Sequence, residues 1–359
     1  MPPEAIIGWD VGGAHLKAAR LDARGTVERV LQLPCPLWQG IDHLHRALDQ
    51  ALSLLDPAPI HALTMTGEMA DLFLNRQTGV VRLVAAMAAR LPAATLQCYA
   101  GADGFVDTDE VAGRAQRLAS ANWMASATMV AACLPVAKLI DVGSTTTDLV
   151  AVQDGRVLAS GSTDAERLLA GELFYTGVVR TPVMALAGEV PFAGDWVPVV
   201  PELFATAADV YRLTGQLPEG ADQHPTADGG EKSVAASARR LARMIGRDVE
   251  SAPLPEWQRL AAWLADAQAT RIDAAWDRLL SRVEVAEDAP VVVAGVGRFV
   301  AAELARRRGC TTVEFGCLLP VAEGERDGAT DCAPAVAVAW LAQRAGLSRF
   351  PAGVAPRAG

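Results

Sequence analysis

The same strand–turn–strand pattern occurs twice in this chain, 131 residues apart. The first copy is WDVGGAHLKAARLDARGTV, residues 9–27, and the second is IDVGSTTTDLVAVQDGRV, residues 140–157. In each copy an apolar run reaches Asp-Val-Gly, a short polar turn follows, and a second apolar run leads to another turn with Gly. Runs of this kind predict β-hairpins, so the chain is expected to fold around two related β-meanders.

Helix-like and strand-like periods alternate after each meander. In the first half the pattern predicts strands at 5–11, 15–22, 26–33, 60–67 and 95–101, and helices at 40–55, from Glu68, at 80–91 and at 109–133. In the second half it predicts three strands within 138–161, strands at 291–297 and 311–315, and helices at 164–174, 202–213, 233–246, 256–283, 298–308 and 334–346. This order indicates an α/β fold in which a βββαβα unit is duplicated.

A chain of 359 residues fits two domains better than one. We place an N-terminal lobe at residues 1–118 and a C-terminal lobe at 119–330. Residues 331–346 predict a helix that packs back on the N-terminal lobe, and residues 347–359 predict a loose tail. Two such lobes, each with an Asp-x-Gly turn, would face each other across a central cleft.

Charge and residue type argue against several classes of function. The net charge of −10 disfavours nucleic acid as a partner, because phosphate backbones bind basic surfaces. The sequence shows no signal-peptide pattern and no apolar segment of membrane-spanning length, so we expect no membrane partner. Six cysteines without a CxxC pair predict reduced thiols and a cytoplasmic protein.

The two Asp-Val-Gly turns have the chemistry of phosphate loops. Glycine allows close approach of the backbone, and N–H groups and small hydroxyls can hold phosphate oxygens. The neighbouring carboxylates can hold Mg²⁺, which bridges to the phosphates. The predicted phosphate-binding residues are Gly12, Gly13 and Lys17 in the first copy and Gly143, Ser144, Thr145 and Thr146 in the second, with Asp10, Asp141 and Asp148 as predicted magnesium ligands.

A third glycine turn lies in VVVAGVGRFVAAEL, residues 291–304. Gly295 and Gly297 precede a predicted helix, whose N-terminus is a natural anion site, so we add both to the predicted phosphate-binding residues. The alternative, left open by the sequence, is that these glycines only allow a strand and a helix to pack closely.

These motifs resemble those of the actin/Hsp70/sugar-kinase superfamily. Asp10, Gly12 and Gly13 match its first phosphate loop, Lys17 follows seven residues after the Asp, and DVGSTTTD (141–148) matches its second loop. The resemblance implies a two-lobed actin-like ATPase fold, similar to ribonuclease H, with Mg²⁺ and a phosphate-bearing ligand between the lobes. Gly295 and Gly297 stand where the superfamily contacts adenosine, but the spacing of the glycines differs, so ATP as a ligand stays open.

Within the superfamily the chain most resembles the hydantoinase A/oxoprolinase-like family. The resemblance is carried by TMTGEMADLF (64–73), GELFYTGVVRTPV (171–183), ATAADVYRLTGQLP (205–218) and TADGGEKSVAASARRLARMIGRD (226–248). It is closest to the members linked to tetrahydromethanopterin-dependent one-carbon transfer and methanofuran biosynthesis. This implies a Mg²⁺-dependent transferase that joins an aminomethylfuran diphosphate to a tyramine- or tyrosine-derived phenol and releases diphosphate, in methanofuran or methylofuran synthesis.

Residue roles follow from this chemistry. Lys17, Asp141 and Asp148 are expected to act on the leaving diphosphate, and Glu68 is the candidate general base for the phenol. The candidate substrate-binding residues, which the resemblance singles out, are Tyr175, Arg180, Thr181, Arg212 and Lys232. The polar loop 215–231 could act as a lid over them.

Two other readings remain open. The same phosphate loops would serve an ATP-dependent kinase or a hydantoinase/oxoprolinase-type hydrolase, and ATP dependence separates these from the transferase. A non-catalytic actin-like assembly or sensor protein is a third reading. The apolar, Trp-bearing helix predicted at 256–283 makes a homodimer possible, but it could equally form the core of a lobe.

Overall fold

The computed structural model describes residues 4–91, 95–286 and 288–347. They form two compact units. Of these described residues, unit 1 comprises those within 1–135, 154–157 and 314–359, and unit 2 comprises those within 136–153 and 158–313. The predicted tail at 347–359 lies outside the described residues, apart from its first position.

A mixed six-stranded sheet forms the centre of unit 1, in the order β3-β2-β1-β4-β5-β6. Its strands are β1 (Ile6–Val11), β2 (His15–Leu21), β3 (Val27–Pro34), β4 (Ile60–Met65), β5 (Thr95–Tyr99) and β6 (Phe105–Asp107). The first three form the antiparallel meander expected from the sequence, and β4 and β5 continue from β1 in parallel. The carboxyl ends of β1 and β4 therefore meet at one edge, beside the first Asp-Val-Gly turn.

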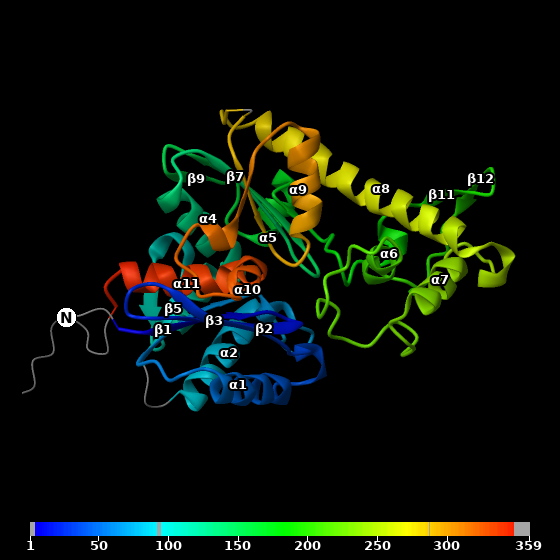
Figure 1. Cartoon of the computed structure of the whole chain (residues 1–359). Helices are drawn as coiled ribbons and strands as arrows, with labels where there is room; N and C mark the ends of the chain where they lie inside the picture. The colour runs from blue at the N-terminus through cyan, green and yellow to red at the C-terminus, as the bar shows by residue number, and fades with distance from the viewer. Residues whose placement is uncertain (1–3, 92–94, 287, 348–359) are drawn as a thin grey trace, which may run out of the picture. The chain divides into compact units, whose positions relative to one another are not determined.

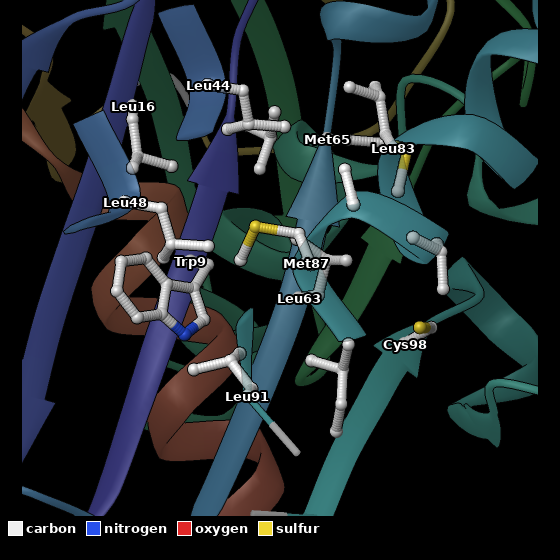
Figure 2. Close-up of a cluster of buried hydrophobic side chains, with 14 of the residues drawn as sticks. Trp9, Leu16, Leu44, Leu48, Leu63, Met65, Leu83, Met87, Leu91 and Cys98 are labelled. Atoms are coloured by element: carbon white, nitrogen blue, oxygen red, sulfur yellow. The ribbon is translucent and has the colours of Figure 1, made fainter. Parts of the chain in front are cut away.

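Helices cover both faces of this sheet (Figure 1). They are α1 (Asp42–Leu54), α2 (Arg76–Arg90), α3 (Val111–Leu118), α4 (Asn122–Cys133), α10 (Arg326–Asp331) and α11 (Ala333–Arg344). Figure 2 shows the core beneath α1 and α2, where Trp9 of β1 packs among Leu, Met and Cys side chains. On the other face α11 lies so close to β1 that a Cβ atom at Gly8 would collide with the carbonyl of Ala335. The alanine-rich sequence of α11 allows this approach.

Unit 2 repeats the meander. Its sheet has the order β10-β8-β7-β13-β14, with β9 beside β8. The strands of this sheet are β7 (Ala137–Val142), β8 (Thr147–Gln153), β9 (Arg156–Leu158), β10 (Leu173–Phe174), β13 (Val291–Ala294) and β14 (Thr312–Glu314). The first two residues of β9 and the last residue of β14 are counted with unit 1. Unit 2 also contains the helices α5 (Asp164–Ala170) and α9 (Arg298–Arg307), and α9 follows β13 directly. Strand β13 runs parallel to β7, as β4 does to β1.

A helical part of unit 2 extends from its sheet along α8 (Leu254–Leu280), which is 27 residues long. It contains α6 (Ala207–Leu213), α7 (Val234–Arg243) and the hairpin of β11 (Glu189–Phe192) and β12 (Asp195–Pro198). These elements share a core with the first half of α8 (Figure 1). The second half of α8 packs on the sheet with β7 and β13. One helix thus joins both parts of the unit.

Four predicted helices differ from the structure. The helix expected at 164–174 ends at Ala170 and is followed by β10, and the helix expected at 202–213 begins at Ala207. The single helix expected at 109–133 is broken into α3 and α4, because Ser120 takes a left-handed conformation with φ of 52°. No α-helix begins at Glu68, which lies on a 3₁₀ turn, Gly67–Met69; α2 starts at Arg76, where the Asn75 side chain accepts a hydrogen bond from the Thr78 amide. The sequence also gave no indication of the β11–β12 hairpin.

The division of the chain differs from the predicted boundaries at 118/119 and 330/331. Unit 1 includes α4, because α4 packs on α11 and β4, and it also includes α10. The helix predicted at 331–346 is α11, which packs on β1, β2 and β4 of unit 1. None of the helices in the described ranges combines the length and apolar character that a bilayer crossing requires.

Candidate functional site

The two Asp-Val-Gly turns are closed in the same way. In unit 1 the Gly12 amide donates to the His15 carbonyl at 2.9 Å, and in unit 2 the Gly143 amide donates to the Thr146 carbonyl at 2.8 Å. Asp10 is paired with Lys17 across the first hairpin, and Asp141 with Asp148 across the second. The sequence repeat is therefore a repeat of backbone geometry and of strand register.

The first turn, which we call loop 1 (residues 12–15), lies beside a buried carboxylate. Asp10 is 3% exposed, and its carboxylate is 3.7 Å from the Lys17 ammonium, which is partly exposed. Thr64 is the neighbour of Asp10 on β4, in register. The buried Thr64 hydroxyl has no hydrogen-bond partner among the described residues. A carboxylate, an ammonium and a hydroxyl thus lie at one edge of the sheet, which suits an anionic or metal-bridged ligand.

Glu68 comes shortly after β4 in the chain, and the turn that carries it lies beside loop 1. A Cβ at Gly67 would approach the carbonyls of Val11 and Gly12 to 3.0 and 3.2 Å, so the turn carrying Glu68 lies against loop 1. The Glu68 side chain is 1% exposed and accepts a 2.8 Å hydrogen bond from the Ser120 hydroxyl. The residue proposed as a base is therefore a buried carboxylate oriented by a serine.

The second turn, loop 2 (residues 143–146), is partly exposed. The hydroxyls of Ser144 and Thr145 are 3.5 Å apart. Asp141 and Asp148 face each other across the hairpin, and like charges in that arrangement repel. Arg167 of α5 offsets this repulsion, because its guanidinium donates to the Asp148 carboxylate at 2.6 Å.

A segment that we call the strap, residues 176–181, supports loop 2 from behind. Its amides donate to the loop carbonyls: Val178 to Gly143 at 3.1 Å, and Arg180 to Ser144 at 2.9 Å. A Cβ at Gly177 would collide with the Ser144–Thr145 peptide. Gly177 is therefore required by the contact between strap and loop.

The third glycine turn packs on the end of β7, directly before loop 2. Gly295 has φ of 80°, and a Cβ there would collide with the Val142 carbonyl and the Asp141 carboxylate. A Cβ at Gly297 would lie 2.5 Å from a Val142 methyl group, and the Gly297 amide donates to the Val142 carbonyl at 2.7 Å. Close packing alone explains both glycines; their predicted contact with phosphate stays a prediction.

The candidate substrate residues at 175–181 take different positions. Tyr175 is 51% exposed, and Arg180 is exposed too, although the surrounding protein lowers the pKa of its guanidinium by desolvation. Arginine remains charged after such a shift. Thr181 is 3% exposed, and its hydroxyl accepts from the Gly177 amide and donates to the Gly177 carbonyl. Thr181 therefore shapes the strap and does not line an open surface.

Arg212 and Lys232 hold the loop 215–231 in place. Arg212 donates to the Asp222 carboxylate at 2.6 Å, and Lys232 donates to the Asp222 carbonyl at 2.6 Å. Arg240 of α7, 1% exposed, contacts Asp228 of the same loop at 3.2 Å. Arg212 thus ties the proposed lid to α6, Arg240 ties it to α7, and Lys232 holds it from the segment before α7. A ligand that used Arg212 or Lys232 would have to displace Asp222.

Magnesium fits one part of this arrangement. Mg²⁺ is commonly held by one or two carboxylates together with substrate phosphates. In the described part of the chain no three His, Cys, Asp or Glu side chains form a complete metal cluster. Asp141 fits, because its partly exposed carboxylate lies at the end of β7 beside loop 2. At Asp148 the metal would compete with the Arg167 ion pair.

Several residues of the site were missed from the sequence. Arg167, Thr64, Ser120 and Gly177 were given no role from the sequence, although Thr64 and Gly177 lie in two stretches, 64–73 and 171–183, that carry the family resemblance. The one available signal was the unbalanced acidic pair of Asp141 and Asp148. Two carboxylates that face each other repel unless a cation lies nearby, but the sequence pattern does not indicate which residue supplies that cation.

The comparisons with known proteins agree on a family. Residues 60–318 match the family model described as Hydantoinase/oxoprolinase. The chain is 30% identical over 252 residues to the (4-{4-[2-(gamma-L-glutamylamino)ethyl]phenoxymethyl}furan-2-yl)methanamine synthase of Methanocaldococcus jannaschii, which covers 68% of this chain and 72% of that protein. The synthase of the same name from Methanococcus vannielii is 34% identical over 111 residues, 31% of this chain and 50% of that protein.

Solved structures with similar folds are more distant in sequence. The nucleotide-free structure of acetone carboxylase has a TM-score of 0.56 at 8% identity, over 94% of this chain and 70% of that chain. A ROK family glucokinase from Streptomyces griseus, in complex with glucose and AMPPNP, has a TM-score of 0.48 at 13% identity, over 95% and 99% of the two chains. At these identities only the fold is shown, and the predicted α/β, actin-like ATPase fold is confirmed.

Proposed function

Because the chain belongs to the hydantoinase/oxoprolinase family, we propose that it is an enzyme of methanofuran-type cofactor biosynthesis. The reaction joins an aminomethylfuran diphosphate to a tyramine- or tyrosine-derived phenol. The carbon–oxygen bond to diphosphate breaks, the phenol oxygen bonds to the same methylene carbon, and the phenol proton leaves to a base. The products are an aryl ether and diphosphate.

The name of the Methanocaldococcus jannaschii relative carries this proposal. It describes a furan with a methanamine group and a phenoxymethyl group, whose phenol bears a γ-glutamylaminoethyl chain. The bond between the ring systems is therefore an ether between a phenol oxygen and a furan-bound methylene carbon. Diphosphate as the leaving group is what the family resemblance implies, and the two phosphate-type turns support it.

The residues can be assigned roles in this reaction. A furfuryl cation is stabilised by the ring, so catalysis depends mainly on positioning and on stabilising the leaving group. In unit 2, the hydroxyls of Ser144 and Thr145 would hold diphosphate oxygens. In unit 1, the proposed phosphate contact is the ammonium of Lys17. Bound Mg²⁺ at Asp141 would neutralise further charge on the diphosphate.

Glu68 is the proposed acceptor of the phenol proton. General bases of this kind contribute about 10²–10⁴-fold in rate. Since Glu68 is 1% exposed, the Gly67–Met69 turn has to open when the phenol binds. Removal of the base should therefore lower kcat far more than it changes the KM for the diphosphate.

The deciding assay incubates the protein with Mg²⁺, aminomethylfuran diphosphate and γ-glutamyltyramine, with and without ATP, and follows products by mass spectrometry. Formation of the ether with one diphosphate released per ether, independent of ATP, supports the transferase. Absence of the ether together with ATP hydrolysis would instead favour an ATP-dependent kinase or hydrolase of the same family.

Matched variants sharpen the assay. Asp141→Asn should abolish Mg²⁺-dependent turnover, and Lys17→Ala should raise the KM for the furan diphosphate. Asp195→Asn is the control, because Asp195 is exposed on the β11–β12 hairpin. Equal activity of Asp141→Asn and Asp195→Asn would show that Asp141 does not hold the metal.

A further inference from the structure

The conformation of loop 2 depends on the strap, because amides of the strap donate to two of the loop's carbonyls, those of Gly143 and Ser144. Gly143 accepts from the Val178 amide, and Ser144 accepts from the amides of both Val179 and Arg180. Gly177 packs directly on the loop backbone. Any shift of the strap would therefore change the loop itself.

One side chain of α8 fixes the strap. The Gln268 amide nitrogen donates to the Thr176 hydroxyl at 2.8 Å and to the Gly177 carbonyl at 3.1 Å. From the other side, the Thr147 hydroxyl of β8 donates to the Thr176 carbonyl at 2.6 Å. The first two residues of the strap are thus held between the long helix and the sheet.

Tyr211 of α6 sets the orientation of the Gln268 amide. Its hydroxyl donates to Gln268 Oε1 at 2.8 Å, and burial raises the pKa of Tyr211, so the hydroxyl keeps its proton. Rotating the amide by half a turn would place Oε1 against the Gly177 carbonyl, where two acceptors repel. The amide therefore has one orientation that satisfies all three partners.

Gln268 stands out among its neighbours on α8. The buried residues of that helix are Trp257, Leu260, Ala261, Leu264, Gln268, Ala269, Ile272, Ala275, Trp276 and Leu279, and Gln268 is the one polar side chain other than indole groups. It is 0% exposed. A carboxamide in such an apolar stripe is unfavourable unless its hydrogen bonds are made.

We infer that Gln268 is a positioning residue for loop 2: its amide, oriented by Tyr211, holds the strap against the loop and thereby determines how tightly the loop binds diphosphate. The ligand in this statement rests on the proposed function. The support of loop 2 by the strap, and of the strap by Gln268, does not depend on the proposed function. The chain of contacts also links α6 and the middle of α8 to the loop.

Hydrogen exchange of the unliganded protein tests the structural half. Gln268→Met keeps the length of the side chain and removes its hydrogen bonds, so peptides covering 143–147 and 176–181 should exchange about tenfold faster than in the wild type. Ile272→Val, one turn further along α8, is the matched control and should leave these peptides unchanged. Tyr211→Phe should give a smaller effect in the same direction, and it serves as the second variant if Gln268→Met does not fold.

Calorimetric titration with magnesium diphosphate tests the binding half. The dissociation constant should rise about tenfold in Gln268→Met and stay at the wild-type value in Ile272→Val. A purely structural role would lower the melting temperature and the active fraction without changing the dissociation constant of the folded protein. Wild-type exchange at loop 2 in both Gln268→Met and Tyr211→Phe overturns the inference, and so does faster exchange with unchanged affinity.

The two proposals fail in different ways. If the wild type does not bind magnesium diphosphate, the proposed function falls, and the exchange measurement alone decides whether Gln268 positions the loop. If the wild type binds it and forms the ether, but Gln268→Met behaves as Ile272→Val does, the function stands and the role of Gln268 is refuted.

Discussion

The guanidinium of Arg167 lies 2.6 Å from the carboxylate of Asp148, and their side chains are 1% and 15% exposed. The two meanders have the same turn geometry but differ in the residue opposite the aspartate that both contain, and this ion pair accounts for the difference. In unit 1 the residue opposite Asp10 is Lys17, a cation supplied by the hairpin itself. In unit 2 the residue opposite Asp141 is a second acid, and the balancing cation comes from α5. Arg167 also approaches Glu172 at 3.9 Å.

Replacement of Arg167 by Met should destabilise unit 2 strongly. It would leave Asp148 and Glu172 without their shared cation in a buried region, and breaking such a pair costs about 3–5 kcal/mol of unfolding free energy. Asp148→Asn should have a smaller effect, because the amide oxygen still accepts from Arg167. Guanidinium chloride unfolding of the variants measures both. A loss of less than about 1 kcal/mol in Arg167→Met would show that the pair is solvated in solution.

The sequence predicted the meanders because their signals are local. Alternation, Gly-containing turns and strand order are encoded within stretches of some 20 residues, and the structure has β1–β3 and β7–β8 where they were expected. The same holds for the residues of loops 1 and 2. Their roles in binding stay predictions.

The partners of those residues could not be predicted, because they come from distant positions in the chain. Ser120 interrupts an alanine-rich helical pattern that reads as continuous, and at the interruption its hydroxyl donates a hydrogen bond to Glu68, 52 residues earlier. Gln268 reaches the strap across 92 positions. Helical periodicity describes which face is buried, but it does not identify the tertiary contact that a buried polar residue makes.

Variants at Ser120 separate backbone strain from the hydrogen bond to Glu68. Both Ser120→Ala and Ser120→Gly remove the donor, but only glycine accepts φ of 52° without strain. The alanine variant should therefore be about 1 kcal/mol less stable than the glycine variant. If Glu68 is the base, kcat should fall by a similar factor in both, since both lose the same orienting contact. A fall in kcat that tracks stability instead would mean that Ser120 only shapes the break between α3 and α4.

Thiol reactivity should follow burial. Cys317 is exposed, whereas Cys35 and Cys98 are buried and desolvation raises the pKa of each to about 12. At pH 8 about one in ten thousand of either buried thiol is ionised, and the thiolate is the reactive form. A colorimetric thiol reagent should label Cys317 first and reach Cys35 and Cys98 only after unfolding. Cys317→Ser should abolish the fast phase; a fast phase that persists would assign it to another cysteine.

The stability of unit 1 should fall with acidification because of His61. Its ring accepts a 2.8 Å hydrogen bond from the Trp9 indole nitrogen, and burial lowers its pKa from 6.5 to about 4. The unfolded chain therefore binds a proton at a higher pH than the folded chain does. Stability from this residue is complete above pH 6.5 and is lost as the pH falls towards 4, by about 2 kcal/mol at pH 5.

Urea unfolding at pH 8 and pH 5 measures this loss, and matched variants assign it. His61→Gln keeps an acceptor near the Trp9 indole and does not titrate. Its loss of unfolding free energy between pH 8 and pH 5 should therefore be about 2 kcal/mol smaller than that of the wild type. His43→Gln, on the partly exposed side of α1, should retain the wild-type dependence. Identical pH dependence in His61→Gln and the wild type would mean that His61 is protonated in the folded state at pH 5. Its ring could not then accept the hydrogen bond from Trp9, and the packing of β1 against β4 would have to tolerate a buried charge.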